Sequence, residues 1–251
     1  MSVYVVSDLH GQYDVFTEGI EKIGFNDEDY LYVIGDAIDR GDDGIRILQH
    51  IMEHNNMDLL IGNHELLMLN SVDLKGKDKC NGDSSRLWLY GNGGNKTFAQ
   101  YEKLSLKARK DLLLWLMGRD LIKTLEVNGR SFCLTHSYYI EGQENKAYSE
   151  MNYEDIWKIV WVSMYRDDRG TWGPDIYQYY DHTFITGHVP VLLVMRWFER
   201  HESFNELRIF EKRNFIDIDG GCALGYQEGL NNGALFLRLD DMKVFTVPMK
   251  I

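Results

Sequence analysis

The chain has 251 residues, of which 44% are hydrophobic and 26% are charged, a balance that is typical of ordinary globular proteins and excludes the disordered and membrane-spanning classes. Its formal net charge of −12 excludes a function that rests on binding a nucleic-acid backbone, because such binding needs a basic surface. An anionic substrate would therefore need a local positive centre, which bound divalent metal ions supply.

The cysteines and the first residues bear on the cellular compartment. Cys80, Cys133 and Cys222 are scattered and odd in number, which predicts reduced residues rather than a disulfide framework or a zinc knuckle. The opening residues, MSVYVVSD, lack the basic region of a signal peptide, and no apolar run approaches the ~18 residues of a transmembrane helix. We therefore expect a cytoplasmic protein without a membrane partner, whose oligomeric state the sequence leaves open.

The chain opens with short apolar runs that alternate with helical patterns. Val3 to Val6, Leu31 to Ile34 and Leu59 to Ile61 have the length of strands, and a polar segment and a helical pattern follow each. The helix expected after the second run places its isoleucines and leucine on one side. This β-α-β-α-β order predicts a parallel sheet.

The middle of the chain predicts a loop, a helix and a hairpin. Residues 73–85 have the composition of a loop, and the Gly/Asn-rich residues 91–95 break the chain before a helical stretch over 96–117. Leu121 to Val127 and Ser131 to Leu134 flank an Asn-Gly pair, which predicts a β-hairpin.

Residues 138–182 differ in composition from the rest of the chain. They hold 8 of the 15 tyrosines and 3 of the 6 tryptophans, mixed with acidic residues, which predicts an inserted cap whose aromatic residues fill a small core rather than a peptide groove. Later apolar segments predict the strands of a second sheet: Thr183 to Thr186, Val191 to Phe198, Leu207 to Phe210, Asn214 to Ile218, Ala234 to Leu239 and Lys243 to Val247. Without repeats or a linker, we expect residues 1–251 to form a single domain.

Each of the three opening strands is followed by polar residues of ligand type. The sequences are SDLHG from Ser7, GDAIDRG from Gly35 and GNHE from Gly62. Two later histidines, His136 and His188, also follow apolar strands. Because the carboxyl ends of parallel strands meet at one edge of a sheet, we expect these side chains to lie together. Oxygen and imidazole ligands suit Mn²⁺, Fe²⁺ or Zn²⁺.

The order DxHG, GDxxDRG, GNHE, a single His and then GH resembles the phosphoprotein phosphatase (PPP) family of the calcineurin-like metallophosphoesterases. The similarity is greatest to its bacterial and bacteriophage-lambda-type serine/threonine protein phosphatases. The motifs span residues 7–188, and Asn92-Gly93-Gly94 is also similar to those members. The resemblance implies an α/β fold: a β-sandwich of two mixed sheets flanked by helices, with the inserted cap over 138–182.

The resemblance also implies a dinuclear metal centre. Carried over by position, it assigns one divalent ion to Asp8, His10 and Asp36. It assigns the second ion to Asp36, Asn63, His136 and His188, with Asp36 bridging. Mn²⁺ is the expected metal, with Fe or Zn as alternatives.

The implied reaction is hydrolysis of a phosphoester by direct attack of metal-bound hydroxide, without a serine or cysteine nucleophile. Arg40 and Asn63 are expected to bind the phosphoryl group. His64 is placed to protonate the leaving alkoxide, and Asp39 to orient and charge its imidazole. The resemblance further implies a second phosphate-binding arginine, for which Arg166 is preferred to Arg169.

Four functions are weighed. The leading hypothesis is a serine/threonine protein phosphatase acting on phosphoproteins or phosphopeptides, and the nearest alternative is a bis(5'-nucleosyl)-tetraphosphatase, which hydrolyses diadenosine tetraphosphate. A catalytically silent phosphate-binding module is disfavoured because every ligand and the His64/Asp39 pair are present. The HxxEH order of His50 to His54 is that of a zinc peptidase, but both histidines lie away from the apolar stripe of their helix, which favours a solvated surface.

The acids near the end of the motif region have a structural interpretation. Asp217 and Asp219 precede Gly220-Gly221, and we expect a turn at the end of a strand there rather than a part of the site.

Overall fold

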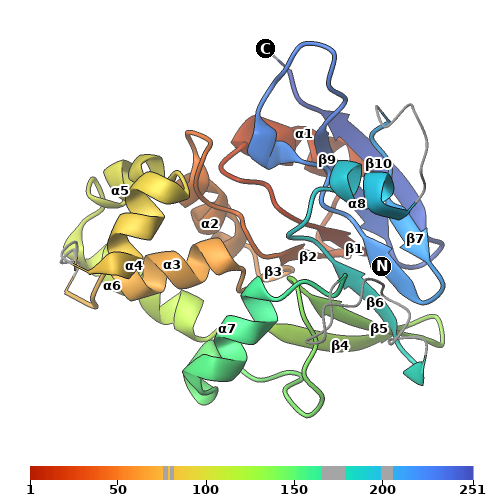
Figure 1. The fold of residues 1–251 in the computed structure, drawn as a ribbon, viewed down its shortest axis with the longest axis horizontal. Helices are drawn as coiled ribbons and strands as arrows, with labels where there is room; N and C mark the ends of the chain where they lie inside the picture. The colour runs from red at the N-terminus through yellow and green to blue at the C-terminus, as the bar shows by residue number, and fades with distance from the viewer. Residues whose placement is uncertain (76–78, 80–81, 166–178, 199–205, 251) are drawn as a thin grey trace.

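The computed structural model describes residues 1–75, 79, 82–165, 179–198 and 206–250. Two five-stranded mixed sheets run through the molecule, and helices flank them (Figure 1). The first sheet has the strand order β10-β9-β1-β2-β3, and the second has the order β4-β5-β6-β8-β7. The expected α/β class, with two mixed sheets flanked by helices, is confirmed.

The strands are β1 (Val3–Val6), β2 (Tyr30–Ile34), β3 (Met57–Leu60), β4 (Ile122–Val127), β5 (Arg130–Thr135), β6 (Thr183–Thr186), β7 (Phe210–Lys212), β8 (Phe215–Asp217), β9 (Gly233–Arg238) and β10 (Lys243–Pro248). The helices are α1 (Tyr13–Ile23), α2 (Gly44–Glu53), α3 (Asn63–Ser71), α4 (Asp83–Arg86), α5 (Gly94–Tyr101), α6 (Leu106–Met117), α7 (Tyr153–Trp161) and α8 (Val191–Phe198). Short turns of helix are η1 (Leu87–Gly91), η2 (Tyr148–Glu150) and η4 (Cys222–Leu224).

The first sheet contains the β-α-β-α-β opening. Strands β1, β2 and β3 pair in parallel, as their apolar runs predict. The expectation for β9 and β10 is wrong, because they join this sheet and not the second: β9 pairs antiparallel with β1, and β10 with β9. Gly19 of α1 explains part of the fit, since a Cβ there would lie 2.0 Å from the Phe236 ring of β9. The helix therefore covers β9 at close range.

The second sheet is built on the predicted hairpin. Strands β4 and β5 pair antiparallel around Asn128 and Gly129, whose φ angles of 50° and 75° suit a two-residue hairpin turn. Strands β6 and β8 then add in parallel to β5. Of the segment expected as a strand over 207–210, only Phe210 belongs to β7.

The apolar run over 191–198 was expected as a strand and forms helix α8 instead. Its buried residues are Val191, Val194 and Met195, which follow the i, i+3, i+4 spacing of a helix rather than alternation. Pro190 precedes them and accepts hydrogen bonds from the first turn. A run of eight residues of which seven are apolar fits either period, and packing decided between them.

The helical stretch expected over 96–117 is two helices, α5 and α6. Ser105 caps α6 by accepting a hydrogen bond from the Ala108 N–H at 3.2 Å. The cap residue therefore marks a new helix start inside a sequence of continuous helical composition.

The described part of residues 138–182 packs against β6 and against the segment after β5. The Tyr139 ring lies 5.1 Å from Phe184 and 5.2 Å from Tyr180, centre to centre. The hydroxyl of Ser137 donates to the Val162 carbonyl at 3.0 Å, which ties the end of α7 to the loop that follows β5. Within the described ranges, no helix combines the length and the apolar composition that crossing a membrane requires.

Candidate metal centre

Five loops that leave the ends of β1, β2, β3, β5 and β6 bring their polar side chains together. Two groups result, each with ligand atoms within 4.8 Å of one another: His10, Asp36 and His64, and Asp36, His136 and His188. The parallel pairing of β1 to β3 and of β5 to β6 produces this convergence, because their carboxyl ends point the same way.

The backbone of these loops is held in an uncommon conformation. Six of the ten non-glycine residues with positive φ among the described residues belong to the site: Asp8, His10, Asp36, Asp39, Arg40 and His188. The loops after β1 and β2 also bind each other, since the N–H of His10 donates to the Asp36 carbonyl and that of Gly41 to the His10 carbonyl, both at 2.9 Å. Such strain persists only where surrounding contacts impose it, and it gathers at functional sites.

Glu65 joins the loops after β2 and β3. Its carboxylate accepts hydrogen bonds from the backbone N–H groups of Asp36 at 2.8 Å, Ala37 at 2.9 Å and Gly62 at 3.0 Å. The side chain is fully buried. Glu65 is the last residue of the GNHE motif, but its role in joining these loops was not predicted. Its position at N3 of α3 is the local signal that points to it.

The three residues assigned to one metal ion by the resemblance, Asp8, His10 and Asp36, lie on the loops after β1 and β2. His10 Nε2 lies 3.9 Å from Asp8 Oδ1 and 3.8 Å from Asp36 Oδ2. All three residues are buried. The three residues that the motifs assign to one metal thus face a common space.

The second ligand group draws on both sheets. Asn63 Oδ1 lies 2.9 Å from His136 Nε2 and 3.0 Å from His188 Nδ1. His136 Nε2 lies 3.4 Å from Asp36 Oδ2. Asp36 therefore belongs to both groups, which is the place of a bridging ligand.

The residues present fit two divalent cations. Asp8 Oδ1 is buried and has no hydrogen-bond partner among the described residues, which is costly unless a further group binds it. His10 and His136 direct Nδ1 at the carbonyls of Ile38 and Ile34, at 3.2 and 3.0 Å, and so turn Nε2 toward the site. This arrangement is that of metal-ligating histidines.

Burial and mutual charge set the protonation of this cluster. Burial raises the pKa of Asp8 to about 7, and burial with the charge of His136 lowers the pKa of His188 to about 3. Burial raises the pKa of Asp36, but the charges of the neighbouring histidines, above all His136 and His64, outweigh it. They hold the pKa of Asp36 well below its usual value. Burial lowers the pKa of His136, but the charge of Asp36, the hydrogen bond to it and the charge of Asp8 together raise it more. The pKa of His136 is therefore raised to about 10. A cation bound here would replace that proton, because metal ligation needs the neutral imidazole.

His64, which lies within reach of His10 and Asp36, forms a buried dyad with Asp39. Nδ1 of His64 donates to Asp39 Oδ2 at 2.7 Å, and its Nε2 lies 3.8 Å from Asp36 Oδ2. Burial lowers the pKa of His64, but Asp36 and the hydrogen bond to Asp39 raise it further, so the net shift is upward. A histidine in this setting can carry a proton at Nε2 toward the space between the ligands.

Two residues outside the sequence motifs hold Asp39 in place. The indole N–H of Trp88 donates to the same Oδ2 at 2.8 Å, and the backbone N–H of Asp39 donates to the Thr97 hydroxyl at 2.9 Å. Trp88 is fully buried, and a Cβ at Gly94 would lie 2.4 Å from its indole nitrogen. Gly94 thus makes room for this indole, a link that no local pattern reveals.

Arg40 is an exposed cation beside the site. Its Nη2 lies 3.3 Å from His64 Nε2, and its backbone N–H donates to the Gly93 carbonyl at 3.3 Å. The guanidinium therefore lies directly beside Nε2 of His64, the ring nitrogen that is not bonded to Asp39. Arg166 and Arg169, the candidates for a second phosphate-binding arginine, lie outside the described residues.

The two aspartates before Gly220 and the two histidines of the HxxEH sequence have structural contacts. Asp217 Oδ1 accepts the Asp219 N–H at 2.8 Å, and Asp219 Oδ1 accepts the Gly221 N–H at 2.8 Å, as the expected turn requires. His50 and His54 stack at 4.5 Å, and their Nδ1 atoms lie 3.0 Å from the Tyr13 hydroxyl and 2.7 Å from the His50 carbonyl. Among the described residues, neither histidine belongs to a metal-ligand group.

Known proteins are similar in sequence to parts of this chain. Over 71 residues the chain is 35% identical to a symmetrical bis(5'-nucleosyl)-tetraphosphatase of Buchnera aphidicola subsp. Acyrthosiphon pisum, and this match covers 28% of the chain and 26% of that protein. It is 26% identical over 163 residues to serine/threonine-protein phosphatase 2 of Salmonella typhimurium, covering 63% of the chain and 66% of the relative. The first relatives are thus matched over about a quarter of their length.

The solved structures agree on the fold. A metallophosphoesterase from Sphaerobacter thermophilus superposes with a TM-score of 0.55 at 13% identity, over 100% of this chain and 88% of that one. The family model for the calcineurin-like phosphoesterases matches residues 1–218. With the ligand loops in place on two mixed sheets, the chain belongs to the calcineurin-like phosphoesterase family, as its motifs predicted.

Proposed function

We propose that the protein is a metal-dependent phosphoester hydrolase that acts as a serine/threonine protein phosphatase. The observation that carries the proposal is the buried dyad, in which Asp39 holds Nδ1 of His64 at 2.7 Å and leaves Nε2 facing the ligand groups. Asp8, His10 and Asp36 would hold one divalent ion. Asp36, Asn63, His136 and His188 would hold the other. When bound, the two ions, most favourably Mn²⁺, supply an acidified water and positive charge for the phosphoryl oxygens.

The chain's own residues then position the ester and its proton. Arg40, exposed beside His64 Nε2, offers a fork of donors to the phosphoryl oxygens. As the bond between phosphorus and the leaving oxygen breaks, that oxygen takes the proton from His64 Nε2. Asp39 stabilises the charged imidazole before the transfer. No cysteine or serine is needed as a nucleophile.

The dyad favours an alkoxide leaving group. A serine or threonine alkoxide is strongly basic and leaves only when it is protonated, whereas the nucleoside phosphate released from a dinucleotide leaves readily without a proton. A buried general acid is therefore of greatest use to a phosphomonoesterase. The similarity over 163 residues to a serine/threonine-protein phosphatase supports the same assignment.

The test is phosphate release in the presence of Mn²⁺. Peptides bearing phosphoserine, phosphothreonine or phosphotyrosine are compared with diadenosine tetraphosphate, and the Asp36→Asn protein serves as the blank. We expect kcat/KM to be highest for the phosphoserine and phosphothreonine peptides. A higher kcat/KM for the dinucleotide would overturn the substrate assignment and leave the metal chemistry intact.

A bis(5'-nucleosyl)-tetraphosphatase is the second candidate. The relatives matched over 71 residues favour it, and so does a cavity of about 380 Å³ whose lining includes Tyr138, Trp157 and Lys158. Tyr138, which lines the cavity, lies two residues after His136 in the chain. The aromatic side chains of the lining suit the stacking of a base. If the dinucleotide is the substrate, Trp157→Ala will raise its KM and leave that for p-nitrophenyl phosphate unchanged. An unchanged KM for both would remove the cavity from this role.

A further inference from the structure

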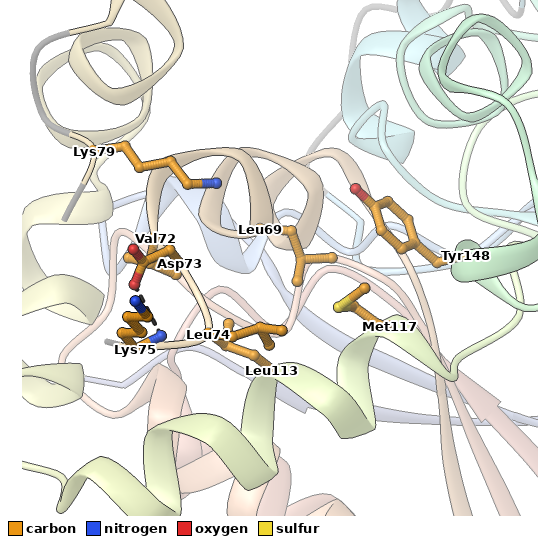
Figure 2. A pocket seen from close by; sticks show the side chains of 9 residues that line it. All are labelled: Leu69, Val72, Asp73, Leu74, Lys75, Lys79, Leu113, Met117 and Tyr148. Atoms are coloured by element: carbon orange, nitrogen blue, oxygen red, sulfur yellow. Dashed lines mark hydrogen bonds between the residues drawn. The ribbon is translucent and has the colours of Figure 1, made fainter. Parts of the chain in front are cut away.

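A second cavity lies away from the metal centre, at the far end of α3. Its volume is about 410 Å³, which is within the ~300–1,000 Å³ of small-molecule sites. Helix α3 begins at the ligand Asn63, and Leu69 reaches the cavity six residues later. Figure 2 shows Lys79 and Tyr148 on opposite sides of the cavity, with Leu69 and Met117 between them.

The base of the cavity is apolar. Leu69 comes from α3, Val72 and Leu74 from the segment after it, and Leu113 and Met117 from α6. Val72 and Leu113 are each only 2% exposed, whereas Leu74 is 44% exposed. The cavity therefore has a firm apolar base and an open apolar edge, which suits the body of an apolar ligand rather than water.

Two lysines stand at the rim of this cavity. Among the described residues, the ammonium groups of Lys75 and Lys79 form no ion pair, whereas Lys96, Lys107 and Lys158 each pair with a carboxylate at 2.8 to 2.9 Å. The rim also contains Asp73, one of whose carboxylate oxygens accepts the Lys75 backbone N–H at 2.9 Å. Counted over its described residues, Lys75, Lys79 and Asp73, the rim is net positive by one in a chain with a net charge of −12.

Backbone contacts hold the rim in place. The Lys79 N–H donates to the Ser71 carbonyl at 2.8 Å, so this lysine is anchored to the last residue of α3. The hydroxyl of Ser85 donates to the Lys79 carbonyl at 3.2 Å. These contacts place the backbone of Lys79 at the edge of the apolar cavity, and a positive group there is the complement of an anion that carries an apolar body.

We propose that this cavity binds a small amphipathic anion, a carboxylate on an unbranched or aromatic apolar body. The apolar body would lie against Leu69, Leu113 and Met117, and the carboxylate would meet Lys75 and Lys79 at the rim. The site is independent of the chemistry proposed for the metal centre. A binding measurement alone therefore tests this proposal.

The probe is decanoate, measured by isothermal titration calorimetry against the full chain at a concentration below micelle formation. We expect one saturable site, and decyltrimethylammonium bound at least tenfold more weakly. The comparison is decisive because non-specific adsorption to an acidic protein would favour the cation. Each methylene added between octanoate and decanoate is expected to lower Kd about fourfold.

Matched variants locate the site. Lys75→Gln/Lys79→Gln is expected to raise the Kd for decanoate about tenfold, a loss of about 0.7 kcal/mol for each exposed charge contact. Lys103→Gln/Lys110→Gln removes the same charge from exposed positions elsewhere and should leave Kd unchanged. Met117→Trp, at a half-buried position, should abolish binding by filling the cavity. An absence of saturable decanoate binding, equal binding of the cation, or unchanged affinity in Met117→Trp would each overturn the proposal.

Discussion

A single carboxylate oxygen connects the dyad to the hydrophobic core. Asp39 Oδ2 accepts from both His64 Nδ1 at 2.7 Å and the Trp88 indole at 2.8 Å. Asp39 is fully buried, so each of these donors matters to its orientation. The indole is a positioning group, because it acts on the imidazole only through the carboxylate.

Replacing Trp88 tests this positioning. Trp88→Phe keeps an aromatic ring and removes the N–H, so His64 would lose its orientation in its proposed role as proton donor. We expect the rate on phenyl phosphate, which has a poor leaving group, to fall about tenfold, and that on p-nitrophenyl phosphate to change little, since general-acid catalysis contributes ~10²–10⁴-fold in all. Steady-state kinetics on the two esters measures the difference.

Two comparisons separate positioning from other causes. His64→Asn should show the same selectivity with a larger loss, and equal losses on both esters would exclude His64 as the general acid. If His64→Asn is selective and Trp88→Phe is not, the indole has only a packing role. Trp115→Phe, at a partly exposed position on α6, is the matched control.

Asp36 is expected to hold both metal ions. In the wild type, the backbone N–H of His64 donates to Asp36 Oδ1 at 2.9 Å. Asp36→Asn retains an oxygen that can accept this hydrogen bond and removes the bridging charge. We expect metal content by mass spectrometry to fall from two ions to one or none, with phosphatase activity falling at least 10²-fold. Asp14→Asn on α1 is the control. A variant that keeps both ions would contradict the bridging role.

At the scale of elements, Glu65 joins α3 to the exits of β2 and β3. Glu65→Ala would leave three buried N–H groups without acceptors, each worth ~1–3 kcal/mol. We expect the free energy of unfolding to fall by about 3 kcal/mol or more, measured by urea denaturation. Glu53→Ala, at an exposed position on α2, should change it by less than ~0.5 kcal/mol. A loss no larger than that of the control would show that water replaces the carboxylate.

Helix α2 should show a pH-dependent stability through its stacked histidines. Burial and the neighbouring His54 lower the pKa of His50 below its ordinary 6.5. The unfolded chain therefore binds more protons near pH 6, and the contribution of His50 is full above pH 6.5 and is lost as the pH falls. We expect urea midpoints of wild type and His50→Gln to converge between pH 7.5 and 5.5. A constant difference across this range would contradict the shift.

At the scale of the whole molecule, two thiols lie inside the core. Cys133 and Cys222 are 0% and 1% exposed, and burial raises the pKa of both above the ordinary value. Because the thiolate is the reactive form, we expect neither to be alkylated by iodoacetamide in the native protein at pH 8. Both should react fully in urea. Peptide mass spectrometry resolves the two sites, and rapid native labelling of either would contradict the burial.

The local motifs predicted most of the candidate site. Asp8, His10, Asp36, Asn63 and His64 each follow a strand whose apolar run is visible in the sequence, and parallel pairing brings such ends together. The carboxyl-terminal edge of the sheet was therefore predictable from short segments. The partners of Asp39 were not, because Trp88 lies 49 residues away in the chain and binds only once α3, η1 and α5 have packed.

The sequence by itself determined the family, the ligand loops and the opening β-α-β-α-β order, because these depend on residues within a few positions of one another. Only the tertiary structure decided that 191–198 is a helix and that β9 pairs with β1, across more than 220 residues of chain. The physical reason is that an apolar run satisfies either period until its neighbours define the buried face. Long-range packing likewise determined the hydrogen bond from Trp88 to Asp39 and formed the cavity with its two lysines at the end of α3.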